Sequence, residues 1–529
     1  MRKAILIYFL LVFAFMLGSQ AYADTTTFRK YPYLVHAGYE TDPSDNITKP
    51  SMMILWHTSK DKAAFISFGQ KDASGNTLKD AGGNIIYEKE IQVQGQDCCE
   101  REGKAAGCVC DTPVSGFLFK HPKGFLTPGS VTDYRVKLPS DSANPFKASF
   151  KAAPDNASTN ITFYGLGDTR ASTNRKPENY VGVVTQMLKD INENWSVRNT
   201  FCIHDGDFVY QGQNDEENTG KDYWDREFFN PEPKKGWNQP VVQFLGHMPV
   251  MGTVGNHEGY YNYGKEDRGT DYKYFGWRFK TYYPYPFYKA GPNRFYYSFD
   301  YGPIHFIMVD TNNRNNPDHK ICADYDTAKR ECRVDWKYDQ PENEESSSNL
   351  QFASLGPKVS DSSPNGQYEW LKDDLIASTK QWNIVVLHNP LYTATGVRDR
   401  FSNTDGGSVT IRDGLHNLLA TELKGKVKLV IQGHDHYYAR SEKDGITYLT
   451  LGTGGANSGG KATAVGYKPG ADHPELKAAY DNDCGPGKNL PCFHFTRFEI
   501  TGTSMNATVK YASQGKSGDI ETFSISLGK

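Results

Sequence analysis

The stretch Leu429–Arg440, which reads L-V-I-Q-G-H-D-H-Y-Y-A-R, constrains the fold of this chain most strongly. The apolar run Val427–Ile431 predicts a buried strand, and Gly433 ends it. His434 and His436 follow on the loop at the carboxyl end of that strand, where ligands bind in open α/β sheets. With one residue between them, the two imidazoles can reach two neighbouring metal ions. Two loop histidines alone are weak support for a metal site, so the interpretation depends on the ends of the other strands.

Strands and helices alternate from about residue 155 onward, which indicates a layered α/β domain. Strands are predicted at 161–166, 200–204, 248–254, 304–309, 383–387 and 427–432, and helices at 178–193, 366–378 and 413–424. Two polar excursions, at about 211–240 and 312–365, are too long for plain connections, and we expect them to shape the site or lie over it. After Gly459, strands are predicted at 493–500, 506–511 and 521–525 as outer strands of the same domain.

A polar residue follows most of these strands. The blocks are G-L-G-D with Asp168, H-D-G-D-F-V-Y with Asp207 and Tyr210, G-N-H-E with Asn256 and His257, V-V-L-H with His388, and G-H-D-H with His434 and His436. Asp, Asn and His all favour turns. Five such blocks in succession, all with oxygen or nitrogen donors, are nevertheless hard to explain as turns. We therefore expect these side chains to gather on one edge of one sheet.

This set of donors predicts a particular chemistry. A carboxylate can bridge two cations, while imidazole, amide oxygen and phenolate complete the coordination of both. Two metal ions roughly 3.5–4 Å apart clamp the attacking and leaving oxygens of an in-line phosphoryl displacement. The sequence contains no G-x-S-x-G, G-x-x-x-x-G-K-[ST] or H-E-x-x-H motif. Gly452, Gly454 and Gly455 lack the spacing of a dinucleotide fingerprint and are predicted to form a loop.

The five blocks resemble those of the calcineurin-like metallophosphoesterases. G-D-F-V-Y, G-N-H-E, V-V-L-H and G-H-D-H resemble in particular those of the purple acid phosphatases. Pro32-Tyr33-Leu34, followed by a strand with Trp56, resembles the amino-terminal sandwich of those enzymes, so the resemblance covers most of the mature chain. It implies an α/β (α+β) layered sandwich domain that carries a binuclear metal centre.

The resemblance also implies a role for each donor. It places Asp168, Asp207, Tyr210 and His436 around a first metal, typically ferric iron, and Asp207 (bridging), Asn256, His388 and His434 around a second, divalent ion such as zinc, iron or manganese. It implies that His257 stays off the metals and either steadies the transition state or protonates the leaving group.

The sequence departs from the family pattern in two places. Many relatives carry D-x-H in the first block and purple acid phosphatases carry D-x-G, whereas Arg170 takes that position here. Because arginine cannot bind a cation, the first metal needs another ligand, and Tyr210 is the candidate. Arg170 itself is either a phosphate-binding residue or a solvated arginine. Plant purple phosphatases have a histidine pair soon after the V-x-x-H block, where this chain has Arg398 and Arg400, so substrate recognition is expected to differ.

The expected function is that of an exported acid phosphatase. It would hydrolyse phosphomonoesters by attack of a metal-bound hydroxide, with Asp207, His257 and Arg170 as the catalytic residues. A phosphodiesterase or nucleotidase on the same scaffold is the alternative among enzymes, because metal ligands alone do not set the ester class. A binding or adhesion module that retains the fold is the alternative from another class. The complete ligand set argues against that module, since a decayed site should have lost at least one ligand.

The first residues predict export. Arg2 and Lys3 form a positive region, residues 4–17 are apolar, and Ala21-Tyr22-Ala23 is an A-x-A cleavage site. Residues 1–23 are therefore predicted to be a signal peptide, which directs the protein to a bacterial periplasm or to secretion. A transmembrane anchor is the weaker interpretation, because the apolar run is too short.

Cysteine usage agrees with export. Of nine cysteines, Cys322 with Cys332 and Cys484 with Cys492 can each close one loop, and the cluster Cys98, Cys99, Cys108 and Cys110 can hold two more disulfides of open connectivity. A zinc knot is the alternative for that cluster, but C-C…C-x-C is not a usual zinc spacing. Cys202 lies in an apolar strand and is predicted to be a buried free thiol.

Residues 24–154 are predicted to form a small antiparallel, fibronectin-like β-sandwich that precedes a catalytic domain at 155–529. Short strand-like runs occur at 51–58, 64–68, 85–93, 116–119 and 132–138, without a long helical pattern between them. The 33 Tyr and 29 Phe fit a β-rich protein. The net charge of -3 indicates neither nucleic acid nor an anionic membrane as a partner, and no later apolar stretch is long enough to span a bilayer. The oligomeric state is open.

Two further polar residues have local explanations. His204 is predicted to brace its loop rather than to bind a metal ion. Asp310 ends the strand I-M-V-D and is either a partner of a ligand histidine or a turn residue.

Overall fold

The structure is a computed structural model. It describes residues 28–41, 47–58, 61–97, 115–120, 126–171, 177–192, 200–210, 212, 223–259, 277–288, 295–311, 325–326, 331–332, 367–392, 415–456, 476–480, 493–512 and 518–527. The predicted signal peptide, the predicted disulfides, Arg398 and Arg400 lie outside the described residues or involve side chains outside them. Cys202 is buried and free, as predicted, and it is the cysteine whose side chain the structure describes.

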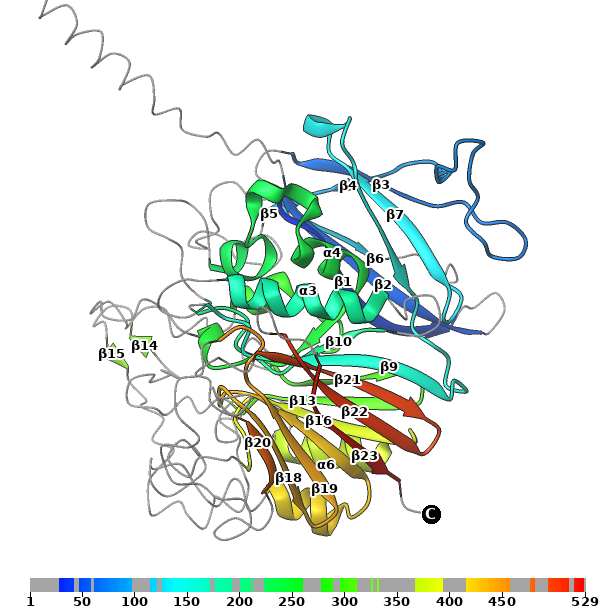
Figure 1. Ribbon diagram of the computed structural model, residues 1–529. Coiled ribbons are helices and arrows are strands. Elements are labelled where there is room, and N and C mark those ends of the chain that lie inside the picture. Colours follow the sequence, from blue (N-terminus) through cyan, green and yellow to red (C-terminus); the bar gives the residue numbers. More distant parts are fainter. Residues whose placement is uncertain are drawn as a thin grey trace, which may run out of the picture.

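Two mixed β-sheets form the centre of the larger, carboxyl-terminal part of the chain (Figure 1). As described, the first sheet has six strands in the order β11-β10-β9-β21-β22-β23. Their bounds are β9 (Asn160–Leu166), β10 (Cys202–His204), β11 (Val250–Gly252), β21 (His494–Thr501), β22 (Ser504–Tyr511) and β23 (Asp519–Ser526). The second, described with seven strands, has the order β12-β13-β16-β17-β19-β18-β20. Its strands are β12 (Tyr297–Tyr301), β13 (Ile304–Val309), β16 (Trp382–Leu387), β17 (Val427–Gln432), β18 (Tyr438–Lys443), β19 (Ile446–Leu451) and β20 (Leu476–Tyr480).

The two sheets pack face to face through aromatic side chains. Phe163 of β9 meets Phe306 of β13 edge to face, with 5.3 Å between the ring centroids, and it stacks on Phe498 of β21 at 4.5 Å. The central strands of both sheets run parallel, β9 with β10 and β11, and β13 with β16 and β17. Strands buried on both faces need nearly continuous apolar runs, and I-H-F-I-M-V and W-N-I-V-V-L supply them.

Helices cover the outer face of each sheet. On the first sheet, α3 (Glu178–Asn192) buries Tyr180, Val184 and Met187, which follow one another at helical spacing. On the second, α6 (Gln367–Ala377) and the segment containing η9 (Leu418–Glu422) bury leucines against Val385, Leu387 and Val430. The order helix, sheet, sheet, helix confirms the predicted layered α/β domain (Figure 1).

The prediction that the polar blocks lie on one edge of one sheet is wrong. Asp168, Asp207 and Asn256 follow strands of the first sheet, whereas His388 and His434 follow strands of the second. The reason is that β21 pairs antiparallel with β9, on the side of β9 away from β10, so β9 has no free side left for β13 or β16. The blocks still meet, because the parallel strands of both stacked sheets end at the same side of the molecule.

The remaining helical segments connect these layers. They are η2 (Trp224–Phe229), η3 (Pro233–Asn238), α4 (Pro240–His247), η4 (His257–Gly259) and α5 (Trp277–Tyr282), with η1 (Pro139–Asp141) in the amino-terminal part and a small pair, β14 (Tyr325–Asp326) and β15 (Glu331–Cys332), in the second excursion. Within the described residues, none of these helices, nor α3 or α6, has the length and apolar character needed to cross a bilayer.

The amino-terminal part contains two antiparallel sheets, each described with four strands (Figure 1). One has the order β1-β2-β6-β5 and the other β4-β3-β7-β8. Their strands are β1 (Phe28–Thr41), β2 (Thr48–Thr58), β3 (Ala63–Phe68), β4 (Ile91–Gln94), β5 (Gln96–Asp97), β6 (Ser115–Lys120), β7 (Val131–Lys137) and β8 (Phe146–Lys151). Leu34 and Trp56 of the first sheet share a core with Ile66, Tyr134 and Phe150 of the second. The fibronectin-like topology and the boundary near residue 154 remain predictions.

Strand β1 also attaches this part to the α/β layers. Alternate residues of β1 point in opposite directions, so Leu34 faces the amino-terminal core while Tyr33 and Val35 join the core of the larger part. The Tyr33 hydroxyl donates to the Tyr282 carbonyl at 2.6 Å, and Lys30 forms a buried ion pair with Asp225 of η2.

Candidate metal centre

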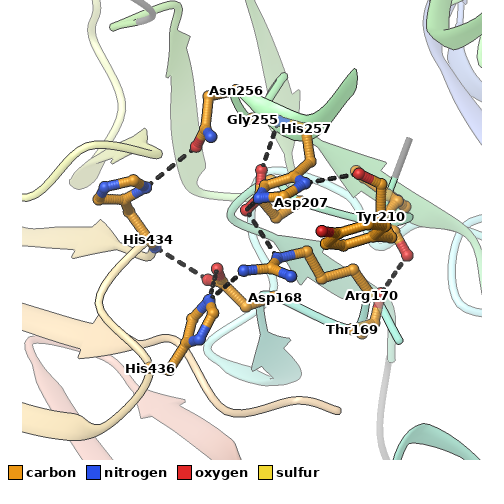
Figure 2. Close-up of polar contacts among 12 residues, drawn as sticks. Asp168, Thr169, Arg170, Asp207, Tyr210, Gly255, Asn256, His257, His434 and His436 are labelled. Atoms are coloured by element: carbon orange, nitrogen blue, oxygen red, sulfur yellow. Dashed lines mark hydrogen bonds and ion pairs between the residues drawn. The ribbon is translucent and has the colours of Figure 1, made fainter. Parts of the chain in front are cut away.

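Side chains of four of the five polar blocks converge at the carboxyl ends of the parallel strands (Figure 2), and His388 of the fifth block lies beside them. Donor atoms of Asp207, His388 and His434 lie within 4.8 Å of one another, and so do donor atoms of Asp168, Asp207 and His436. Asp207 therefore belongs to both groups, which is the position that a bridging ligand requires. The six residues that lie together are Asp168, Asp207, Asn256, His388, His434 and His436, and their roles as ligands stay predictions.

The second group is held by hydrogen bonds that orient its imidazoles. His388 donates from Nδ1 to the Asp205 carbonyl at 2.9 Å, so its Nε2 faces Asn256 Oδ1 at 3.0 Å and Asp207 Oδ1 at 3.2 Å. Nδ1 of His434 lies 3.0 Å from the same Asn256 oxygen. A backbone carbonyl that fixes the tautomer in this way leaves the other ring nitrogen available to a cation.

The first group contains a guanidinium between its donors. His436 Nε2 lies 3.2 Å from Asp168 Oδ1 and accepts a hydrogen bond from Arg170 Nη2 at 3.1 Å. Arg170 Nε lies 3.3 Å from Asp207 Oδ2. Figure 2 shows the Arg170 side chain reaching between Asp207 and His436. Arg170 is thus a partner of the candidate ligands, and the interpretation as a solvated arginine does not fit its position.

Tyr210 lies beside this guanidinium. Its ring centroid is 5.5 Å from Arg170 Cζ and 5.3 Å from the His257 ring. The Tyr210 backbone N–H donates to Glu227 Oε2 at 2.7 Å, and the Ala171 N–H donates to the same oxygen at 3.3 Å. Burial raises the pKa of Glu227 to about 7. Glu227 comes from η2, so the first polar excursion does shape the site, as expected.

The backbone at the site adopts a left-handed conformation at three candidate ligands. The φ angles are 48° at Asp168, 57° at Asp207 and 68° at His434. Residues other than glycine rarely adopt this backbone region, although Asp, Asn and His tolerate it best. Each such residue costs on the order of 1–3 kcal/mol, which the surrounding contacts must offset. The His434 N–H donates to Asp168 Oδ2 at 2.9 Å, and this bond connects the loops of the two sheets.

Glu258, which the sequence analysis did not single out, holds two of the loops together. Its carboxylate accepts hydrogen bonds from the N–H groups of Asp207 at 3.0 Å, Phe208 at 2.8 Å and Gly255 at 2.6 Å. Burial and the charge of Asp207 raise its pKa to about 8. A side chain at Gly255 would lie 2.2 Å from the Asp207 nitrogen, so only glycine fits there. Glu258 is the last residue of the motif G-N-H-E, and its side chain is fully buried.

His257 faces Asp207 across the site. Its Nδ1 donates to the Tyr210 carbonyl at 2.6 Å, which leaves Nε2 3.7 Å from Asp207 Oδ2. Burial, together with the charge of Arg170, holds the pKa of His257 well below its usual value.

The charges around Asp207 keep it ionised. Burial opposes the charged form, but His257, His388 and Arg170 outweigh it and hold the pKa of this carboxyl well below its usual range. For the neighbouring Asp205, burial and the charge of Asp168 raise the pKa well above its usual range. Asp205 is a second residue that the sequence analysis did not single out.

The donor set fits a pair of cations. Within the described part of the chain, Asp168 Oδ1 and Asp207 Oδ2 are buried and accept no hydrogen bond, although His436 Nε2 lies 3.2 Å from the first oxygen and Arg170 Nε lies 3.3 Å from the second. Buried polar atoms normally have a partner, and an exception indicates a missing ion or water. Carboxylate, amide and imidazole donors together suit zinc, iron or manganese.

His204 and Asp310, for which the sequence suggests local roles, both form hydrogen bonds within the fold. His204 Nε2 lies 3.0 Å from Thr169 Oγ1, and its Nδ1 accepts the Gly206 N–H at 3.2 Å. These bonds confirm that His204 braces its loop. Asp310 is buried at the end of β13, where its backbone exchanges two hydrogen bonds with the Gln367 side chain.

Comparison with known proteins agrees with this geometry. The family model described as calcineurin-like phosphoesterase matches residues 163–438, more than half of the chain. Over 158 residues, the chain is 28% identical to an acid phosphatase from Aspergillus ficuum, which covers 28% of this chain and 22% of that protein. Over 242 residues, it is 24% identical to purple acid phosphatase 23 from Arabidopsis thaliana. This match covers 44% of this chain and 39% of that protein. The matches thus span less than half the length of either relative.

Solved structures share the fold. Purple acid phosphatase PPD1 from yellow lupin (Lupinus luteus) seeds superimposes with a TM-score of 0.54 at 16% identity, over 94% of this chain and 74% of that one. The structure of PhoD superimposes with a TM-score of 0.58 at 14% identity, over 95% of this chain and 92% of that one. The family match and the converging blocks lead to one conclusion: this chain belongs to the calcineurin-like phosphoesterase family, in which it resembles the purple acid phosphatases.

Proposed function

We propose that this protein is an exported, metal-dependent phosphoric ester hydrolase, and in particular an acid phosphatase that acts on phosphomonoesters. The observation that carries the proposal is the position of Asp207, whose carboxylate belongs to both donor groups. Two cations bound there would supply the charge that stabilises the attacking and leaving oxygens of phosphoryl transfer. Ferric iron with a divalent zinc, iron or manganese ion is the proposed pair, with Tyr210 as the phenolate ligand.

Individual residues of the chain would bind the two cations and the substrate. Asp168, Asp207, Tyr210 and His436 would hold one cation, and Asp207, Asn256, His388 and His434 the other. Arg170 lies within reach of both Asp207 and His436, so its guanidinium is placed to hold a phosphate oxygen once a cation has taken its place between them. His257 would face the substrate with Nε2, because its Nδ1 is engaged by the Tyr210 carbonyl.

The first test is metal content together with ester preference. We would purify the mature protein, measure iron, zinc and manganese, and assay a chromogenic phosphomonoester beside the matching diester from acid to alkaline pH. Two metal ions per chain and a monoester preference with an acid optimum are expected. A diester preference near neutral pH would instead assign the protein to phosphodiesterases or nucleotidases.

The second test is the variant Asp207→Asn, which removes the shared carboxylate. It should lose both metal retention and turnover, whereas Asp190→Asn, at a buried carboxylate that pairs with Arg497 on the far side of the first sheet, should keep both. Full activity in Asp207→Asn would contradict the bridging role. If the wild-type protein bound no metal and cleaved neither ester, it would be a binding module that retains the fold.

A further inference from the structure

Asp205 is a fully buried carboxylate that lies against the candidate metal centre. It follows β10, and its backbone carbonyl accepts the hydrogen bond from His388 Nδ1 at 2.9 Å. Donor atoms of Asp168, Asp205 and His388 lie within 4.8 Å of one another. The residue therefore faces one candidate ligand of each metal site.

The space for this carboxylate exists because two neighbouring residues are glycines. A Cβ atom at Gly167 would lie 1.3 Å from Asp205 Oδ1. A Cβ atom at Gly433 would lie 2.5 Å from the same oxygen and 2.8 Å from Asp168 Oδ2. These glycines immediately precede Asp168 and His434 in the chain. The two loops that carry candidate ligands thus leave a cradle in which the Asp205 side chain sits.

Neither side-chain oxygen of Asp205 has a hydrogen-bond partner among the residues that the structure describes. A buried carboxylate without partners costs several kcal/mol, and a protonated carboxyl in the same place would also leave its O–H unsatisfied. Packing in the protein core alone therefore stabilises neither the ionised nor the protonated form of Asp205. A cation bound beside Asp168 and His388 would balance the charge of this carboxylate and give its oxygens a partner.

We propose that Asp205 is a further metal ligand of this centre, which binds a cation together with Asp168 and His388. The inference rests on the proposed function, since it concerns the same metal site. Asp205 adds a third aspartate to Asp168 and Asp207 and so raises the negative charge available to the cations. Removing that charge should weaken metal binding by roughly tenfold to a hundredfold, the range found when groups that support a metal site are lost.

The test measures metal binding directly. Apo wild-type protein, Asp205→Asn and the control Asp190→Asn are titrated with Zn²⁺ against a competing chelator, and the melting temperature is recorded with and without Zn²⁺. Asp205→Asn should fold, with the far-ultraviolet circular dichroism of the wild type, and should show at least tenfold weaker Zn²⁺ binding and a smaller rise in melting temperature. Equal stoichiometry and affinity within twofold would overturn the proposal. If the wild type itself binds no metal, the proposed function fails instead.

A second pair of variants tests the cradle without relying on Asp205→Asn. Gly167→Ala places a methyl group where Asp205 Oδ1 lies, so it should also weaken Zn²⁺ binding. In an Asp205→Ala background that clash is absent, and Gly167→Ala should cause no further loss. If Gly167→Ala weakens binding equally in both backgrounds, its effect does not pass through Asp205, and the proposal is wrong.

Discussion

Arg170 Nη2 lies 3.1 Å from His436 Nε2, so a guanidinium donates to the nitrogen that the first metal would use. The same side chain contacts Asp207 Oδ2 through Nε at 3.3 Å. A cation and this guanidinium cannot both occupy the space between His436 and Asp207. A cation bound there would therefore have to displace Arg170, and we expect the displaced guanidinium to remain within reach of a phosphate group.

Arg170→Met should separate these two effects. The apolar chain removes the competing charge, so the first metal should bind several-fold more tightly. Loss of a charge-assisted hydrogen bond should weaken inhibition by inorganic phosphate by roughly 10–100-fold, which corresponds to about 1.5–3 kcal/mol. Metal titration and phosphate inhibition of the loaded enzyme measure the two effects, with Arg135→Met, on β7 of the amino-terminal part, as control. Unchanged phosphate inhibition would remove Arg170 from substrate binding.

Metal affinity should rise with pH, because protons compete for His388. Burial alone lowers the pKa of this imidazole, but the charges of Asp207 and Asp168 raise it to about 10. Zn²⁺ must displace that proton, so affinity should fall about tenfold for each pH unit below 10. Calorimetric titration in buffers of different ionisation enthalpy should detect the released proton. Binding without proton release would contradict the role of His388 as a ligand.

Glu227 should make the protein less stable as the pH rises. The pKa of Glu227 in the native protein, about 7, exceeds the ordinary glutamate value of 4.5, so the native state holds the proton more tightly than the unfolded chain. The stabilising contribution is full below pH 4.5 and is lost as the pH rises through 7, in total about 3 kcal/mol. Glu227→Gln should abolish this part of the pH dependence in urea unfolding at pH 5 and pH 8, while Glu90→Gln should preserve it. If the free energy of unfolding changed equally between pH 5 and pH 8 in wild type and Glu227→Gln, the prediction would be contradicted.

His305 should stabilise the second sheet up to a higher pH. It lies between Asp300 at 2.7 Å and Asp374 at 2.8 Å, which outweigh burial and raise its pKa to about 9. The stabilising contribution of protonated His305 is full below pH 6.5 and is lost as the pH rises through 9. Because Asp300 is partly exposed, solvent screening reduces it to about 1–2 kcal/mol. A double-mutant cycle of His305→Gln and Asp374→Asn, by urea unfolding at pH 6 and pH 10, should show coupling only at pH 6.

The sequence predicts which polar side chains come together better than it predicts the arrangement of strands around them. Asp168, Asp207, Asn256, His388 and His434 could be found because each follows a strand within a few residues, so local pattern is sufficient. Strand neighbours are set by contacts between distant segments. The apolar runs of β9 and β13 look alike in the sequence, and nothing local assigns them to different sheets.

The missed residues share a physical reason. Glu258, Glu227 and Asp205 matter because of what surrounds them after folding: three backbone N–H groups, the Tyr210 N–H, and a cradle between two glycines. Their sequence context shows an acidic residue near a loop and does not show burial. Arg170 was recognised as a departure from the family pattern, but only the structure shows which atoms it contacts.

The pairing of β9 with β21 affects how the protein is made. Asn160 lies opposite Thr501, and Gly165 opposite Thr496, so the strand that leads to Asp168 gains its second neighbour only after β21, which lies far along the chain, has been synthesised. Until then, one side of β9 presents unpaired backbone groups, which invite association with other chains. We therefore expect the candidate metal centre to assemble late in biogenesis, and a product truncated before His494 to accumulate as an insoluble polypeptide.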